Sequence, residues 1–327
     1  MTTTRRAVRG LATVLLTGLS LAYIIWKIDI RQTAHVLADA NLGYFLLAAA
    51  ITIGAVFPLA WRWQKLLAAR GVDENLGWLT RTYFTSTTIG QLLPSGLGGD
   101  ATRIYSTTRR HRDATSVVTG SVLLERALGG FATLALAAVG FVLALGRYDV
   151  GAYLWIEALL FVGGAVAAFV LLSARARRPL AHGARLLRLV RLDRPIRTAY
   201  EGVHGYRVHA RLLGWAFALT VAVQVFRVLA IWLIARSVGV DLSPRPFYVL
   251  GPLLFLVMLV PFTVNGLAIR EAFFVSFLGK LHVAPDPAFA TGFLFYLLSI
   301  ASSIPGALLL AGGMRRPRKD KSVEIRT

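Results

Sequence analysis

The chain contains no cysteine among its 327 residues, and only 16% of those residues are charged. The absence of cysteine excludes disulfides, thiolate metal sites and cysteine nucleophiles. Soluble proteins carry about 25% charged and about 45–50% apolar residues, whereas the apolar share here is 56%. Acidic residues are especially scarce: 16 stand against 36 lysines and arginines, for a net charge of +20. A water-soluble enzyme is therefore nearly excluded.

The motifs of the large enzyme classes are also missing. The sequence has no HExxH, no glycine-rich phosphate loop ending in Lys-Ser/Thr and no Gly-x-Ser-x-Gly. Its six histidines fall in loops or at the ends of apolar runs, without the spacing of a metal site. We therefore expect no metal, no cofactor and no catalytic residue. Nothing in the chain supports transport driven by its own ATP hydrolysis.

Long apolar runs dominate what is present. A membrane-spanning helix needs roughly 20 mostly apolar residues. The first run follows three arginines, as in a signal peptide, but it ends in Ile-Ile-Trp-Lys without a small-residue cleavage site. We therefore expect it to remain as the first span. The six predicted spans are residues 11–26, 42–60, 116–145, 153–172, 212–235 and 288–311.

Two further segments, 78–93 and 247–260, are short, and each ends in a Pro/Gly break. The break residues are Pro94, Gly98, Gly99, Pro261 and Gly266. Irregular backbone at membrane depth is tolerated only where it is buried in protein or lines a water-filled cavity. We therefore predict re-entrant hairpins around 78–110 and around 247–281. The predicted fold is an all-α polytopic membrane protein with about six full spans plus these two hairpins.

The distribution of charge predicts the orientation. With the N-terminus inside, most lysines and arginines fall on the inner segments, as the positive-inside rule requires. Both termini are then cytoplasmic, in the inner membrane of a bacterial or archaeal cell. The basic excess reflects topology and attraction to the anionic cytoplasmic leaflet. Nucleic acid, which a charge of +20 first suggests, is therefore not expected as a partner.

The same pattern divides the chain into four parts. They are a first membrane half (1–173), a basic linker (174–211), a second membrane half (212–313) and a basic tail (314–327). Arginines in the linker are interleaved with leucine and valine, which favours an amphipathic helix in the headgroup layer. The linker is too short to fold as a catalytic domain.

The two Pro/Gly breaks align without a gap. Pro94 and Arg103 enclose SGLGGDAT, and Pro261 and Arg270 enclose FTVNGLAI with the same spacing. One hairpin lies in each half, and the charge-based topology opens them to opposite sides. This predicts an inverted repeat, in which paired broken segments mark a transporter's binding site. A break also leaves unpaired N–H groups that attract an anion such as phosphate, beside an arginine that binds it.

Several charges fall inside predicted membrane segments, where each costs about 2.5–3.5 kcal/mol and is usually paired. Glu125 and Arg126 point about 100° apart on a helix and cannot simply pair with each other. We expect Glu125 to pair with Arg103, and Arg126 with Asp100. Arg227 is expected to pair with another helix or to snorkel, and residues 61–63 (Trp-Arg-Trp) to anchor an interface. Mutual neutralisation remains the alternative to a functional role.

Four runs together resemble one family. They are RWQKLLAARG (62–71), GQLLPSGLGGDATRIY (90–105), LLERALGG (123–130) and NGLAIREA (265–272). The chain resembles the flippase-like membrane domain of the lysylphosphatidylglycerol synthase superfamily, from about residue 11 to 311. The resemblance implies two broken hairpins that move lipid headgroups between leaflets. It also implies the type without an appended soluble synthase, so aminoacyl transfer is not implied.

The chain departs from the family at the second break. Val264 and Asn265 stand where the family is usually richer in proline and glycine. A side-chain amide there can still bond a headgroup, so Asn265 joins the candidate ligands. The predicted substrate-binding residues are Asp100, Arg103, Glu125, Arg126, Asn265, Arg270 and Glu271.

The predicted function is a flippase for a phospholipid or a polyprenyl-linked lipid, with Arg103, Arg126 and Arg270 on its phosphate. Two alternatives stay open. One is a membrane-embedded transferase or accessory subunit with Glu125 or Glu271 as base, and the other is a non-transporting scaffold. A homodimer through glycine-rich helix faces and a partner lipid synthase or glycosyltransferase are further expectations.

Overall fold

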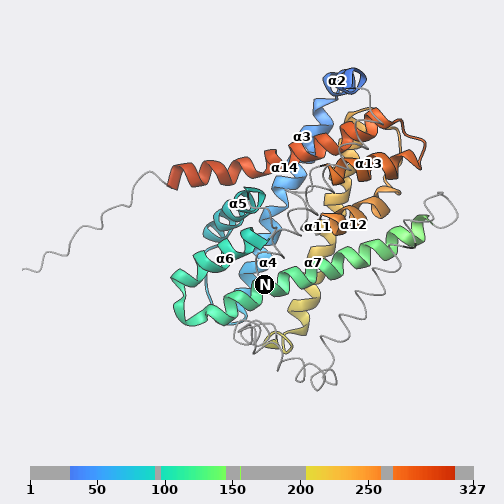
Figure 1. Ribbon diagram of the computed structural model, residues 1–327. Helices are drawn as coiled ribbons and strands as arrows, with labels where there is room; N and C mark the ends of the chain where they lie inside the picture. The colour runs from blue at the N-terminus through green and yellow to red at the C-terminus, as the bar shows by residue number, and fades with distance from the viewer. Residues whose placement is uncertain (1–29, 93–96, 145–154, 156–203, 259–267, 314–327) are drawn as a thin grey trace, which may run out of the picture.

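The computed structural model describes residues 30–92, 97–144, 155, 204–258 and 268–313. Throughout these ranges the secondary structure is helical, without a strand (Figure 1). The long helices are α3 (Leu42–Gly54) continued by α4 (Val56–Ala68), α7 (Thr115–Ala144), α11 (Ala210–Ser237) and α14 (Pro285–Gly313). The shorter elements are α2 (Ile30–Ala38), α5 (Leu76–Leu92), α6 (Leu97–Arg110), the 3₁₀ turn η1 (Arg112–Ala114), α12 (Phe247–Val257) and α13 (Ile269–Gly279).

Among the described residues, four helical segments are long and apolar enough to cross a membrane. They are Leu42–Ala68, Arg112–Gly140, Ala210–Ser237 and Pro285–Gly312. They confirm the predicted spans at 42–60, 116–145, 212–235 and 288–311 as apolar helices. Outside the described residues lie the predicted spans at 11–26 and 153–172, apart from residue 155. Most of the linker 174–211 also lies outside them, and only residues 204–211 of it are described.

The first of these segments is interrupted between α3 and α4. Pro58 lacks the N–H that would bond the carbonyl of Gly54, and its ring crowds that turn. The two helices meet at Ala55, and the chain continues in nearly the same direction (Figure 1). A proline in a span is thus accommodated as a local break.

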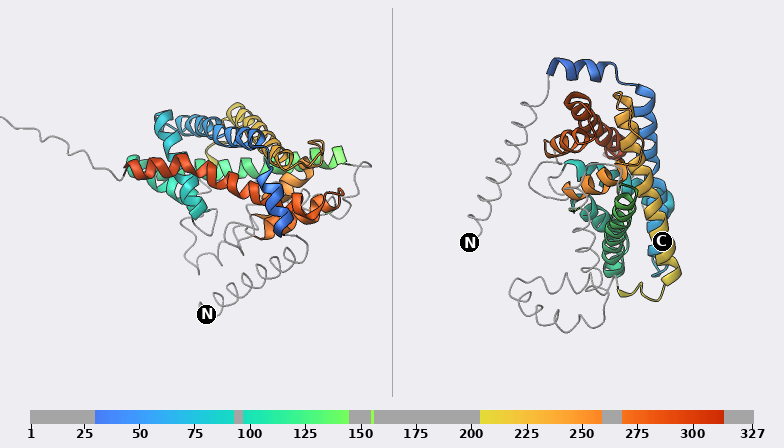
Figure 2. Two further views of the ribbon diagram at one scale, coloured as in Figure 1. Left: turned by 90° about the horizontal axis from the view of Figure 1, so that it is seen from above. Right: turned by 90° about the vertical axis from the view of Figure 1, so that its right-hand side faces the viewer.

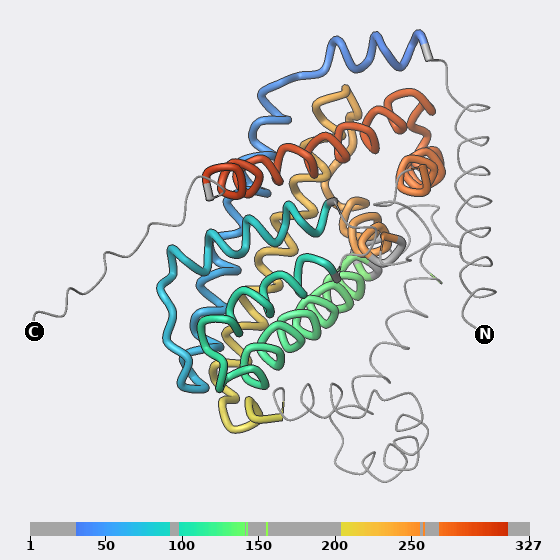
Figure 3. The backbone as a smooth tube through the Cα atoms, turned by 60° about the vertical axis from the view of Figure 1, so that its left-hand side comes forward, coloured from blue at the N-terminus to red at the C-terminus, as the bar shows by residue number. Residues whose placement is uncertain are grey.

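Helices α5 and α6 form an antiparallel pair (Figure 3). Gly90 lies near Gly99, the ring of Tyr83 near Arg103, and the ring of Trp78 near Arg110. Helix α5 is rich in threonine, but its hydroxyls mostly donate to carbonyls one turn earlier in the same helix. This satisfies the polar groups locally, so a Thr-rich helix can lie among apolar ones.

Two contacts show how the helix ends are arranged. The N–H of Asn41, before α3, donates to the carbonyl of Ser237 at the end of α11, over 2.7 Å. The hydroxyl of Tyr206, just before α11, donates to the carbonyl of Leu66 near the end of α4, over 2.9 Å. The α3–α4 segment and α11 are therefore antiparallel. The α5–α6 pair follows the end of α4, whereas α12 follows the opposite end of the bundle, after α11.

Helix α2 lies across the bundle at the end where α3 begins (Figure 2). The Thr33 hydroxyl donates to the carboxylate of Asp286, in the first turn of α14, over 3.1 Å. This bond connects α2 to the start of the last long helix.

At the opposite end of the bundle, a glutamate in the loop between α4 and α5 contacts basic side chains at the end of α6. The Glu74 carboxylate accepts from Arg110 Nε at 2.6 Å and lies 2.9 Å from His111 Nε2. Burial alone would raise the pKa of Glu74, but the hydrogen bonds with His111 and Arg110 outweigh it and hold that pKa below its usual range. The loop thereby holds the end of α6.

The lowered pKa of Glu74 predicts a pH-dependent contribution to stability. A carboxyl whose pKa is lower in the folded state stabilises above its unfolded value and loses this contribution as the pH falls through the folded value. We expect Glu74→Gln to lower the free energy of unfolding at neutral pH by about 0.5–1 kcal/mol. Thermal unfolding in detergent should show the two proteins converging below about pH 4. An equal difference at every pH would contradict the prediction.

Candidate functional site

Five ionisable side chains from three helices meet inside the bundle, and we call them the charge cluster. Helix α4 supplies Arg62, α6 supplies Asp100 and Arg103, and α7 supplies Glu125 and Arg126. Arg62, Arg103 and Glu125 are 3–4% exposed. Such residues in an apolar protein require partners, because an unpaired buried charge is costly.

Glu125 is the centre of the charge cluster. Its carboxylate accepts from Arg62 Nη2 at 2.9 Å and from Arg103 Nη1 at 2.6 Å. The hydroxyl of Tyr83 lies 3.4 Å from the same carboxylate. Arg62 also donates to the hydroxyl of Thr220 in α11. One carboxylate thus joins α4, α5, α6 and α7, and through Arg62 also α11.

Asp100 completes the charge cluster. It accepts from Arg103 Nη2 at 3.0 Å and from Arg126 Nε. The predicted pairs of Glu125 with Arg103 and of Arg126 with Asp100 are therefore confirmed. They join the first predicted hairpin to the following span.

Aromatic rings enclose Arg103. Its guanidinium carbon lies 4.3 Å from the ring centre of Tyr83 and 4.9 Å from that of Trp63. Trp63 is fully buried, and its Nε1 donates to the Ser121 hydroxyl at 2.9 Å. The prediction that residues 61–63 anchor an interface is wrong for two of the three, because Arg62 and Trp63 lie in the core. Trp61 alone is exposed, at 41%.

Arg62 and Tyr83 are therefore members of the site that the residue pattern did not predict. Arg62 lies beside two tryptophans at the end of an apolar run, which is also the composition of an interfacial anchor. Helical spacing was a signal for Arg62, since Arg62 and Trp63 lie on the helix face that continues with Leu66 and Leu67.

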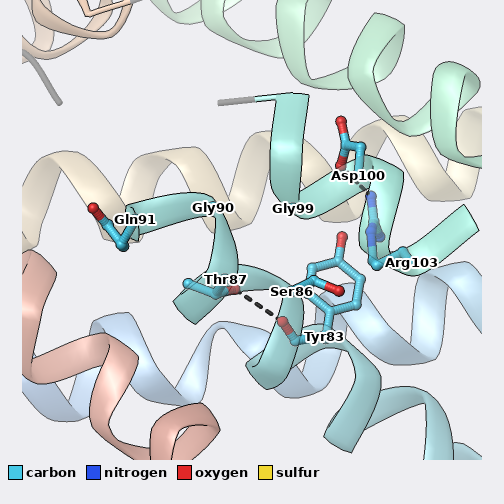
Figure 4. A pocket seen from close by; sticks show the side chains of 8 residues that line it. All are labelled: Tyr83, Ser86, Thr87, Gly90, Gln91, Gly99, Asp100 and Arg103. Carbon is cyan, nitrogen blue, oxygen red and sulfur yellow. Dashed lines mark hydrogen bonds and ion pairs between the residues drawn. The ribbon is translucent and has the colours of Figure 1, made fainter. Parts of the chain in front are cut away.

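In the part of the chain that the structure describes, three cavities with Tyr83 in their wall lie around the charge cluster. The first, about 300 Å³, lies between α5 and α6 and contains Thr87, Gln91 and Asp100 (Figure 4). The second, about 200 Å³, contains the whole charge cluster. The third, about 280 Å³, lies among α3, α4, α5, α11, α12 and α14. We call them together the central cavities.

The close approach of α5 and α6 beside the first cavity depends on small residues. Gly99 faces Gly90 (Figure 4), and a Cβ on Gly99 would lie 2.6 Å from the carbonyl oxygen of Ser86. A side chain at this position would separate the helices. Gly98, the preceding break residue, accepts from the Thr102 hydroxyl at 2.9 Å through its carbonyl.

The residues after the second break form a separate pair. Arg270 is fully buried and donates to the carboxylate of Glu271, its neighbour in sequence. The ring of Tyr296 in α14 lies 4.9 Å from the guanidinium carbon. Neither Arg270 nor Glu271 lines any of the central cavities. Of the other predicted site residues, Pro94, Pro261, Asn265 and Gly266 lie outside the described ranges.

The aligned positions of the two breaks also differ in conformation. Ala101 lies inside α6, whereas Ala268 precedes α13 with a φ of 68°. The Ala268 N–H donates to the Glu271 carboxylate at 2.7 Å. An acidic side chain of the chain itself thus occupies the start of α13, where an anion was expected to bind. Arg103, by contrast, lies in the second turn of α6.

Nothing in the described ranges suggests a metal centre. No three histidine, aspartate or glutamate side chains there lie together as metal ligands would. The arginines of the charge cluster offer positive charge and hydrogen-bond donors to an anion.

Two comparisons with known proteins bear on this site. No curated protein matches the chain. The family model of the lysylphosphatidylglycerol synthase TM region matches residues 10–306, which include α2 to α13 and most of α14. The match thus covers the charge cluster and the central cavities as well as the long apolar helices. The protein is a multi-pass membrane protein, and it belongs to the lysylphosphatidylglycerol synthase TM region family.

Proposed function

We propose that the protein is a flippase that moves a phosphate-bearing lipid between the leaflets of the cell membrane without changing it chemically. The family relates the chain to lipid modification or transport. The proposed orientation has both termini on the cytoplasmic side, where the basic residues meet the anionic leaflet. The lipid would be a phospholipid or a polyprenyl-linked lipid.

The observation that carries the proposal is the polar lining of the central cavities inside an apolar helical bundle. The wall of the second cavity contains four arginines, two carboxylates, Thr220 and Gln224. A polar headgroup cannot cross hydrocarbon without replacement of its hydration, and such a lining supplies donors for it. A scaffold that only needed to hold its helices together would not require polar cavities.

The arrangement of the short helices supports a transport path. The α5–α6 pair begins and ends beside the end of α4, and α12 begins at the opposite end of the bundle. Broken helices that enter from opposite sides are typical of inverted-repeat transporters, in which one half rocks against the other around a central site. We propose that the α5–α6 pair forms the first re-entrant hairpin and that α12 belongs to the second.

The bonds of Glu125 favour transport over the alternative of a transferase. A catalytic base must approach the proton it abstracts with a free oxygen. Both carboxylate oxygens of Glu125 are already held by arginines, Oε1 by Arg62 and Oε2 by Arg103. The transferase is tested by mass spectrometry of lipid incubated with the protein, where a product of changed mass would replace the present proposal.

Exchange of Arg103 for Gln is expected to abolish headgroup translocation. Arg103 borders both the first and second cavities and joins Asp100 to Glu125, so its loss removes a cation and misplaces two carboxylates. The assay measures transbilayer movement of fluorescent phospholipid in reconstituted vesicles. Arg109→Gln is the matched control, since Arg109 is exposed in the last turn of the same helix. Normal translocation by a well-inserted Arg103→Gln protein would remove the proposal.

A further inference from the structure

Arg227 differs from the other arginines around the central cavities. It lies well inside the apolar helix α11, and its side chain is accessible. Its Nη1 donates to the amide oxygen of Gln224 at 3.3 Å, and its guanidinium carbon lies 4.9 Å from the ring centre of Phe255. In the part of the chain that the structure describes, no carboxylate pairs with it. The contact with Phe255 joins Arg227 to α12 as a cation–π contact and not as an ion pair.

The side chain of Arg227 faces the central cavities. It lines the second cavity opposite the charge cluster, and it lines the third cavity as well. The other polar residues of the third cavity include Thr87, Gln91, Ser299 and Ser302. The hydroxyls of Thr87, Ser299 and Ser302 donate to carbonyls of their own helices, so the guanidinium of Arg227 is the group in this wall suited to phosphate oxygens.

The charges of the second cavity do not balance. Its wall contains Arg62, Arg103, Arg126 and Arg227 against Asp100 and Glu125, a formal excess of two positive charges. Arg62, Arg103 and Arg126 donate to the two carboxylates, which leaves Arg227 without a countercharge. An uncompensated cation in a span is costly, so such a residue is retained where an anion or water meets it. The same excess would repel a cationic headgroup.

We infer that Arg227 binds the phosphate of the transported headgroup, and that this headgroup carries two negative charges, as a phosphomonoester or a diphosphate does. The inference deepens the proposed function and rests on it. A headgroup with two negative charges neutralises the second cavity, whereas a cationic aminoacylated headgroup adds to its excess. The charge cluster positions the site, and Arg227 contacts the substrate.

The test is transbilayer movement of fluorescent lipids in vesicles containing the full chain. The lipids are phosphatidic acid, phosphatidylcholine and lysylphosphatidylglycerol, which differ in headgroup charge. We expect the wild-type protein to prefer phosphatidic acid to the cationic lipid by about tenfold or more, because a cationic headgroup faces like charge in the second cavity. Arg227→Gln should lose this preference with a higher apparent KM, and Arg227→Lys should retain most of it.

Arg211→Gln is the matched control, since Arg211 is exposed in the first turn of the same helix. Equal or greater transport of the cationic lipid, or an unchanged preference in Arg227→Gln, would overturn the inference and leave the proposed function standing. Movement of no lipid would overturn both. Inorganic phosphate added as a competitor distinguishes the source of the ligand. Slower lipid movement in the presence of phosphate, without any preference among the lipids, would also overturn the inference. If Arg227→Gln fails to insert, the inference is tested by the lipid preference of the wild-type protein and by that of Arg227→Lys.

Discussion

Exchange of Glu125 for Gln is expected to be the most destabilising single charge removal in the protein. The substitution keeps the side chain's shape but leaves Arg62 and Arg103, both nearly fully buried, without their shared carboxylate. Removing one partner of a buried ion pair costs about 3–5 kcal/mol because the other charge remains desolvated. Asp100 still accepts from Arg103, whereas Arg62 is left with its hydrogen bond to the Thr220 hydroxyl.

The measurement is thermal unfolding of the purified protein in detergent, followed by the tryptophan fluorescence of the core. Asp73→Asn is the control, since Asp73 is exposed in the loop after α4 and its loss removes one negative charge. We expect a large loss of stability for Glu125→Gln and almost none for the control. Equal stability of Glu125→Gln and the wild-type protein would show that Arg62 and Arg103 do not need this carboxylate.

Exchange of Gly306 for Val is expected to separate α14 from α5. A Cβ on Gly306 would collide with the carbonyl oxygen of Phe84 and the hydroxyl of Thr88. The backbone cannot move aside locally, since the Thr88 hydroxyl also donates to the Ser303 carbonyl at 2.7 Å, across the same contact. Overpacking of this kind costs about 1–3 kcal/mol, and more where backbone is struck. The expected result is a lower unfolding temperature together with slower lipid movement, because α5 and α14 both line the third cavity.

Gly312→Val is the matched control for this prediction. Gly312 lies six residues further along the same helix, and nothing approaches the position of its Cβ. A valine there adds the same volume and the same change in helix propensity. Equal effects of the two substitutions would mean that the contact between α5 and α14 does not limit side-chain size.

Much of the fold follows from residue patterns. Uninterrupted apolar runs predicted the spans that α3–α4, α7, α11 and α14 confirm, because hydrocarbon admits few alternatives to a long apolar helix. The two pairs joining Asp100, Arg103, Glu125 and Arg126 were also predictable. Adjacent residues on a helix diverge, so each needed a partner elsewhere, and opposite charges lay only one segment away.

The rest of the site could not be predicted in this way. Arg62 and Trp63 have the composition of an interfacial anchor, and only the packing of α4 between α5, α7 and α11 places them in the core. Arg270 and Arg103 have the same spacing from the prolines of their breaks. Yet α13 begins immediately before Arg270, whereas Arg103 lies in the second turn of α6, so the two arginines meet different surroundings.

The sequence by itself determined that the chain crosses a membrane, where its long apolar helices lie, and that the charges within those helices need partners. Those properties depend on local composition and on the cost of charge in hydrocarbon. Only the tertiary structure decided which of the arginines around the central cavities are neutralised. Ion pairing depends on distances between helices remote in sequence, and these bring two carboxylates to Arg62, Arg103 and Arg126 but none to Arg227.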